Sequence, residues 1–190
     1  MRMTRAESKQ HTRAAVLAAA REVFARDGFH GATLERVAEE AGFTKGAVYS
    51  AFDSKGDLFL AVYEARVAER AARAQAAAPK TFEETARAAM DEWRHVMRTE
   101  RAWSAALTEF WVHASRDEDL RRRFRAAHRA WHGTVAASIE AAAAADGRRL
   151  PMSSERMATT IMAFGNGLAL EALLGDDHGE LMEDMIRRLT

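Results

Sequence analysis

The segment from Thr33 to Tyr49 constrains this chain more than any other, because two short helical patterns flank one glycine there. Thr33 is a favourable N-cap for the first pattern, whose apolar residues recur three or four apart: Leu34, Val37, Ala38 and Ala41. Gly42 ends this helix and Thr44 can cap the next one. A small buried residue, a glycine turn and apolar positions that fix the angle between two helices are the parts of a helix-turn-helix.

The remainder of the chain also predicts helices. The hydrophobic share of 48% comes mostly from alanine, and long stretches contain neither glycine nor proline. The predicted helices cover residues 9–26, about 55–75, roughly 15 residues from Phe82 and from Arg101, 117–145, 153–174 and 181–189, with Pro79 and Pro151 between them. We predict an all-α protein of about nine to ten helices, with a three-helix helix-turn-helix domain at residues 1–56 and a helical domain at 57–190.

Charge and composition exclude several classes of protein. The 28 basic and 28 acidic residues cancel, but the N-terminal segment has a basic surplus of four, with Arg2, Arg5, Lys9, Arg13, Arg21 and Arg26 against Glu7 and Glu22. The absence of cysteine excludes disulfides, thiolate zinc sites and cysteine catalysis. Neither a signal peptide nor a run of about 18 apolar residues is evident. We therefore expect a cytoplasmic protein with no membrane partner.

The second helix of the motif has a surface suited to the major groove of DNA. Its outward positions are short, polar or basic: Thr44, Lys45, Gly46, Ala47, Tyr49 and Ser50. Gly46 permits close backbone approach, the Tyr49 hydroxyl can reach a phosphate, and Thr44 and Lys45 can contact backbone or base edges. Lys55, at the start of the next helix, can bind a phosphate together with the free N–H groups of that turn. Taken singly, Tyr49 and Phe52 are better interpreted as core aromatic residues, and Lys45 and Lys55 as ordinary surface residues.

The whole N-terminal pattern resembles the TetR/AcrR family of transcriptional regulators between Val16 and Val62. The resemblance rests on Gly28-Phe29, the unbroken run 33–49, Phe52, Ser54-Lys55 and Leu58-Phe59. Two residues depart from the family pattern: Ala51 replaces a polar residue or histidine, and Gly56 replaces a frequent glutamate, which weakens the helix start by about 1 kcal/mol. The resemblance implies that DNA is contacted by Thr33, Thr44, Lys45, Gly46, Tyr49 and Lys55, with Ala47 as a further candidate.

The C-terminal part resembles the family loosely, at residues 115–121 and 164–171. In the family the last two long helices make a homodimer, so the resemblance implies an interface that includes Phe164, Gly165, Gly167 and Leu168, with the glycines permitting close helix approach. Glycines merely tolerated within a helix are the alternative. A dimer would bind a palindromic operator in double-stranded DNA, because two half-sites multiply the discrimination of one short helix.

An aromatic and methionine-rich set lies between the motif and these last helices. It could line an adaptable apolar pocket formed by Trp93, Met97, Trp103, Phe110, Trp111, His128, Trp131 and Met162. The family implies an unidentified small hydrophobic or aromatic effector, whose binding would tilt the fourth helix and release DNA from a repressor. Two alternatives stay open. These residues can be plain core, and the C-terminal half can recruit a protein partner and sense no ligand.

No motif predicts an enzyme, a cofactor or a metal site. His128 and His132 have a spacing that zinc sites use, but no third ligand is evident. Glu92 and His95 have the spacing of di-iron bundles, which need two such copies. The arginines at 121, 122, 123 and 125 predict a solvated helix face, because Asp117, Glu118 and Asp119 stand beside them.

Overall fold

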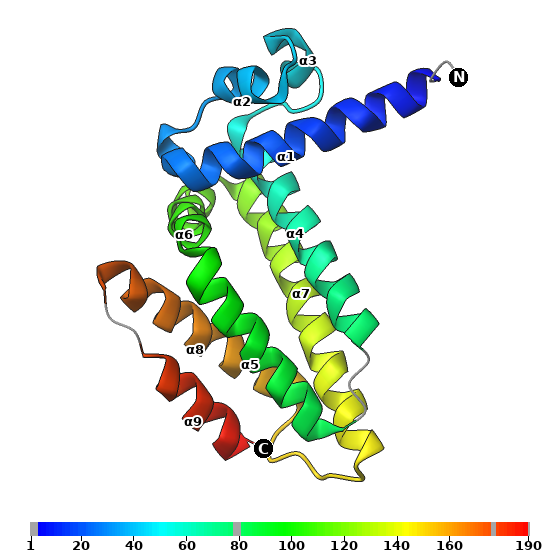
Figure 1. Ribbon diagram of the computed structural model, residues 1–190, viewed down its shortest axis with the longest axis vertical. Helices are drawn as coiled ribbons and strands as arrows, with labels where there is room; N and C mark the ends of the chain where they lie inside the picture. The colour runs from blue at the N-terminus through cyan, green and yellow to red at the C-terminus, as the bar shows by residue number, and fades with distance from the viewer. Residues whose placement is uncertain (1–3, 78–80, 176–177, 190) are drawn as a thin grey trace. The chain divides into compact units, whose positions relative to one another are not determined.

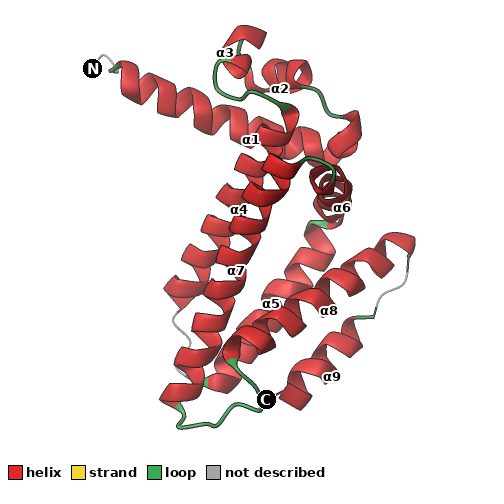
Figure 2. Ribbon diagram, turned by 180° about the vertical axis from the view of Figure 1, so that it is seen from behind, coloured by secondary structure: helices red, strands yellow, loops and turns green. Residues whose placement is uncertain are grey.

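The structure, a computed structural model, describes residues 4–77, 81–175 and 178–189. Across these residues the regular structure is entirely helical (Figures 1 and 2), which confirms the predicted all-α class. The helices are α1 (Arg5–Gly31), α2 (Leu34–Ala41), α3 (Lys45–Tyr49), α4 (Lys55–Ala77), α5 (Phe82–Thr99), α6 (Arg101–Ser115), α7 (Glu118–Ala145), α8 (Ser154–Leu174) and α9 (Gly179–Leu189).

Most predicted helix bounds agree with the structure to within two residues, and α1 is the exception. It begins at Arg5 rather than Lys9, because Thr4 and Glu7 form a capping box in which each side chain accepts the other's backbone N–H. Gly28 breaks the helix, as expected, with φ 72°, but one further turn continues to Gly31. Pro79 lies outside the described residues, whereas Pro151 separates α7 from α8 as predicted.

The helix-turn-helix forms for the local reasons that the sequence suggests. The Thr33 hydroxyl accepts the N–H of Arg36 at 3.2 Å and caps α2, and the Thr44 hydroxyl accepts the N–H of Ala47 at 3.3 Å and caps α3. Between the two helices, Gly42 takes a left-handed conformation with φ 71°. The predicted caps and turn are therefore confirmed.

The chain divides into two compact units: unit 1 holds residues 1–67 and 105–124, and unit 2 holds 68–104 and 125–190. The core of unit 1 is aromatic and includes Phe24, Phe29, Phe59 and Phe110, with the Phe59 and Phe110 ring centroids 4.4 Å apart. The predicted core positions Val37, Ala38 and Val48 are also buried there. The predicted boundary after residue 56 separates a DNA-binding part from a sensing part and does not coincide with the limits of the compact units. It stays a prediction.

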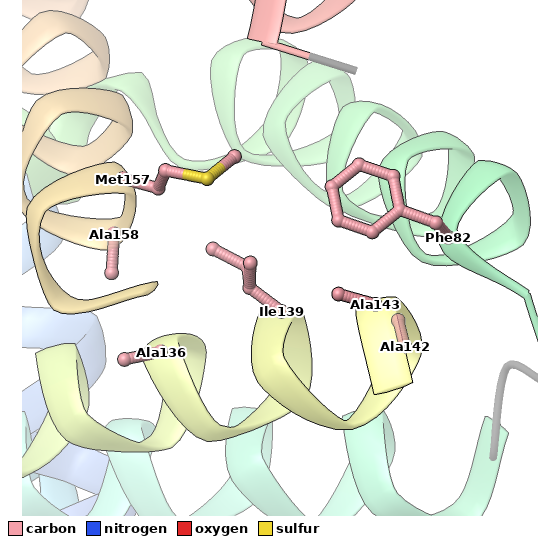
Figure 3. Packing of buried hydrophobic residues seen from close by; sticks show 7 residues of the cluster. All are labelled: Phe82, Ala136, Ile139, Ala142, Ala143, Met157 and Ala158. Atoms are coloured by element: carbon pink, nitrogen blue, oxygen red, sulfur yellow. The ribbon is translucent and has the colours of Figure 1, made fainter. Parts of the chain in front are cut away.

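Unit 2 contains two apolar clusters. In the first, the start of α5, the C-terminal half of α7 and the start of α8 meet (Figure 3), through Phe82, Ala136, Ile139, Ala142, Ala143, Met157 and Ala158. The second joins α5, α8 and α9 through Met90, Leu168, Met182 and Ile186. An ion pair between Arg94 and Glu183 also links α5 to α9. Because alanine dominates the α7 side of the first cluster, that helix can approach its neighbours closely.

Helix α8 exposes apolar side chains that the described residues do not cover. By length and composition alone α8 is apolar enough to cross a membrane, although polar residues interrupt it, and 28% of its most apolar window is buried. Leu170 is 50% exposed and Leu174 is 83% exposed. These side chains remain available to a partner.

Candidate DNA-binding surface

Helix α3 presents polar groups on a rigid apolar support. Its only inward residue, Val48, is fully buried. Thr44, Lys45, Gly46 and Tyr49 are exposed, as predicted, whereas Ala47 is half-buried. A Cβ placed on Gly46 would meet nothing closer than the Thr44 hydroxyl, at 4.0 Å. The backbone at Gly46 can therefore approach another surface, such as a DNA backbone, without steric hindrance.

The two capping threonines differ in what their hydroxyl groups can donate to. Thr33 and Thr44 are both exposed, and in each the hydroxyl oxygen accepts a backbone N–H. A threonine hydroxyl also has one O–H donor. That of Thr33 is hydrogen-bonded to the Glu35 carboxylate, whereas that of Thr44 can donate to a phosphate oxygen without giving up its cap. The caps hold the two hydroxyl groups in fixed positions at the starts of α2 and α3. Only the family resemblance predicted that these threonines face DNA.

Tyr49 has a partner that sequence reasoning missed. Its hydroxyl donates to Glu35 Oε1 at 2.9 Å, and this hydrogen bond raises the pKa of Tyr49 and helps lower the pKa of Glu35, which its own backbone N–H lowers most. The hydroxyl must therefore exchange a carboxylate for a phosphate if it contacts DNA. Glu35 lies on α2, fourteen residues away, and no sequence signal linked the two side chains.

Lys55 serves the end of α1. Its ammonium donates to the carbonyl oxygens of His30 at 3.0 Å and Ala32 at 2.9 Å, and lies 4.8 Å from the centroid of the Phe29 ring. Burial lowers the pKa of Lys55, and the charge of Glu109 opposes this shift. Two of the three ammonium N–H groups are thus committed within the protein, and one remains for a phosphate.

Glu109 of α6 also contacts the end of α1. Its Oε2 accepts the backbone N–H of His30 at 2.9 Å. A Cβ on Gly28 would lie 2.9 Å from Glu109 Oε1, so the carboxylate occupies the space that only glycine leaves. Lys55 and Glu109 therefore both hold the start of the helix-turn-helix, and no sequence pattern predicted the contact of Glu109.

The start of α4 is held by α7. A Cβ on Gly56 would lie 2.9 Å from Leu120 Cδ2, so the Leu120 side chain would have to shift to admit the glutamate that the resembling family often has. Asp57 accepts from the Ser54 hydroxyl at 2.6 Å and from Arg123 Nη1 at 2.5 Å. These residues border a cleft of about 340 Å³ in unit 1.

The arginines at 121, 122, 123 and 125 are all exposed, as predicted.

The residues predicted to line an effector pocket fall in both units. Phe110 is fully buried in the aromatic core of unit 1, so the alternative interpretation as core describes it better. Trp103 is buried in unit 2, Trp111 is 40% exposed in unit 1, and the others are half-buried in unit 2: Trp93, Met97, His128, Trp131 and Met162. A cleft of about 670 Å³ in unit 2 is lined by other residues, among them Ala136, Glu140 and Arg148.

The residues predicted at a dimer interface divide into two groups. Gly165 and Leu168 are buried within unit 2, and a Cβ on Gly165 would lie 2.9 Å from Met182 Cε and 3.3 Å from Trp93 Nε1. Gly165 therefore makes a close approach to residues of its own chain. Phe164 is half-buried, and Gly167 is exposed with open space around it.

No group of three or more potential metal-binding side chains occurs among the residues whose placement is described.

Comparison with known proteins identifies the family. A model of the bacterial regulatory proteins of the tetR family matches residues 16–62, the same range as the sequence resemblance. A model of the C-terminal part of BetI-type transcriptional repressors matches residues 82–190, more than half of the chain.

Curated relatives match the N-terminal part. The uncharacterized regulator TtgW of Pseudomonas putida is 45% identical over 65 residues, which are 34% of this chain and 48% of TtgW. The repressor BepR of Brucella suis is 44% identical over 62 residues, 33% of this chain and 29% of BepR. The chain thus matches less than half the length of either relative.

Solved structures match nearly the whole fold. A TetR transcription regulator of Haloarcula marismortui has a TM-score of 0.76 at 20% identity, with 95% of each chain covered. The regulator FadR of Bacillus subtilis has a TM-score of 0.72 at 15% identity, covering 92% of this chain and 96% of its own. With both halves matched by family models and the helix-turn-helix formed as those models require, this chain belongs to the TetR family of transcriptional regulators.

Proposed function

We propose that this regulator is a repressor that binds a palindromic operator as a homodimer and is released by a small hydrophobic or aromatic effector. The observation that carries the proposal is the exposed polar face of α3 on its buried Val48 support. Thr33, Thr44, Lys45, Gly46, Ala47 and Tyr49 would face DNA, and Lys55 would bind a phosphate with its remaining N–H. Names of relatives such as BepR support repression, although the relative FasR of Mycolicibacterium smegmatis is named an activator.

The exposed face of α8 supports the homodimer. Ala163, Gly167, Leu170 and Leu174 are exposed and recur three or four residues apart, so they form one apolar stripe along the helix. Exposed apolar stripes of this kind mark interaction surfaces. The proposed interface therefore consists of this stripe, with Gly167 at its centre, and does not include the buried Gly165 and Leu168.

The comparisons support a small-molecule effector by fold alone. FadR of Bacillus subtilis was solved in complex with stearoyl-CoA, so a fold of this kind can accommodate a ligand with a long apolar chain. Half-buried tryptophans and methionines in unit 2 offer such a ligand apolar, adaptable contacts. A C-terminal half that recruits a protein partner and binds no ligand is the alternative, favoured by the exposed leucines of α8.

Binding to operator DNA tests the proposal. Fluorescence anisotropy with DNA flanking the gene, over a salt series, should show tight binding that requires the palindrome. Tyr49→Phe removes only the hydroxyl and should weaken binding several-fold, while Lys45→Ala should lower the salt slope by about one per half-site. Arg87→Ala, on exposed α5 surface, is the matched control. Equal affinity for all DNA sequences, also in selection from random DNA, would exclude operator recognition.

An effector screen distinguishes a C-terminal half that binds a small molecule from one that recruits a protein partner. Apolar and aromatic compounds are added to the protein–DNA complex, and loss of anisotropy is followed. Dissociation by one compound class, with saturable binding to the free protein, is the expected result. If no compound releases DNA or binds the free protein, the partner-recruiting alternative takes its place.

A further inference from the structure

Two histidine side chains of α7 converge in unit 2, and the proposed function does not explain them. His128 and His132 are four residues apart, and their Nε2 atoms lie 3.0 Å from each other. Both side chains are half-buried. Their spacing in the sequence did not predict a function for this pair, because spacing does not reveal how the two imidazole rings are oriented.

The ring geometry does not suit a straight hydrogen bond. Two imidazoles that point directly at each other would have centroids separated by the nitrogen–nitrogen distance plus one ring radius at each end. Here the centroids are 4.5 Å apart, only 1.5 Å more than the nitrogens, and the ring planes are inclined by 59°. The ring axes are therefore tilted off the line between the two nitrogens, which bends a hydrogen bond and is compatible with two ligands of a single ion.

The separation also fits particular metals. With metal–nitrogen bonds of about 2.0–2.1 Å, two nitrogens 3.0 Å apart subtend an angle of about 90° at the ion. Square-planar and octahedral ions such as Cu²⁺ and Ni²⁺ use this angle, whereas tetrahedral Zn²⁺ needs a wider one. We propose that His128 and His132 bind one divalent Cu²⁺- or Ni²⁺-like ion, with water in the remaining coordination positions.

The surroundings keep the rings in the form that binds metal. Burial, and next the neighbouring His132, lower the pKa of His128 to about 4, and burial lowers that of His132. Both rings are neutral at pH 7, as metal ligation requires. The Thr159 hydroxyl lies 3.4 Å from His132 Nδ1, where it can accept the Nδ1–H and leave Nε2 for the ion.

Calorimetric titration of the full-length, tag-free protein with Ni²⁺ tests the site. After treatment with a chelator and dialysis, wild type should bind one Ni²⁺ per chain, and Mg²⁺, which prefers oxygen ligands, should not bind. His128→Ala and His132→Gln should each weaken Ni²⁺ binding roughly tenfold or more. His95→Ala, a histidine on exposed α5 surface, should leave it unchanged.

Spectroscopy identifies the ligands. Electron paramagnetic resonance of the Cu²⁺-loaded wild type should show two coordinated nitrogens, and His132→Gln, whose folding is checked by circular dichroism, should lose this signature. Absence of saturable Ni²⁺ binding in wild type, or Ni²⁺ binding in both variants as tight as in wild type, would overturn the proposal and leave the pair hydrogen-bonded only. Operator binding is measured separately, so either result is independent of the proposed repressor function.

Discussion

A single glycine decides how α1 is joined to the helix-turn-helix. Gly28 combines φ 72° with a carboxylate where a Cβ would stand, so any side chain there meets both backbone strain and Glu109. Gly31, one turn later, has no positive φ, and its nearest neighbour would lie 3.7 Å from a Cβ. The two glycines look alike in the sequence but differ in what they permit.

We therefore expect Gly28→Ala to lower the free energy of unfolding by about 1–3 kcal/mol, through strain and loss of the Glu109–His30 hydrogen bond. Gly31→Ala should change it by less than about 1 kcal/mol. Urea unfolding followed by tryptophan fluorescence measures both. Equal effects of the two substitutions would show that Glu109 and the positive φ do not constrain this corner.

Lys55 shows what the sequence could not reveal about the site. Its position matched a phosphate-binding lysine, but the structure also places its ammonium on the carbonyl of His30, in the last turn of α1, and on that of the C-cap residue Ala32. Lys55→Ala should therefore reduce both stability, by about 1–2 kcal/mol, and the salt slope of operator binding, by about one per half-site. An unchanged salt slope would restrict Lys55 to its structural contact.

At the scale of helices, the sequence predicted the elements well because their signals are local. Thr33, Gly42 and Thr44 act within one turn, so caps and breaks could be predicted from neighbours alone. Contacts between helices distant in sequence, such as Glu109 with His30, leave no periodic trace. Gly165 illustrates the same limit, since a glycine signals close approach without identifying its neighbour, and here Met182 and Trp93 of the same chain lie next to it.

The contact between α4 and α7 has a pH dependence of known sign. Burial alone would raise the pKa of Asp57, but hydrogen bonds from Ser54 and Arg123 outweigh it and leave the pKa below its ordinary value. The ionised carboxylate thus stabilises the fold above the unfolded pKa of about 3.9, and this contribution is lost as the pH falls through the lower folded pKa.

Asp57→Asn should therefore destabilise the protein by about 1 kcal/mol at pH 7, and the difference from wild type should shrink below about pH 4. Thermal unfolding at fixed protein concentration, from pH 7 to pH 3, measures this. Glu83→Gln, in an exposed pair with Arg87, is the control and should cost less than about 0.5 kcal/mol. A difference for Asp57→Asn that is constant with pH would rule out the ionised contact.

For the whole molecule, the exposed stripe of α8 bears on both assembly and DNA binding. Leu170→Glu combined with Leu174→Glu places charges on the proposed interface and should convert a dimer into a monomer of 21.1 kDa, measured by light scattering. Because one half-site then binds without its tethered partner, operator affinity should fall about 100-fold or more.

Val112→Glu tests whether the position of the charge matters, since Val112 is 50% exposed on α6 and lies outside the stripe. This control should remain dimeric and bind operator as wild type does. A double variant of α8 that stays dimeric would place the interface elsewhere, and the exposed leucines would then be available to a different protein. A double variant that becomes monomeric yet keeps full operator affinity would instead mean that one helix-turn-helix suffices, because the avidity of two tethered reading helices would contribute nothing to binding.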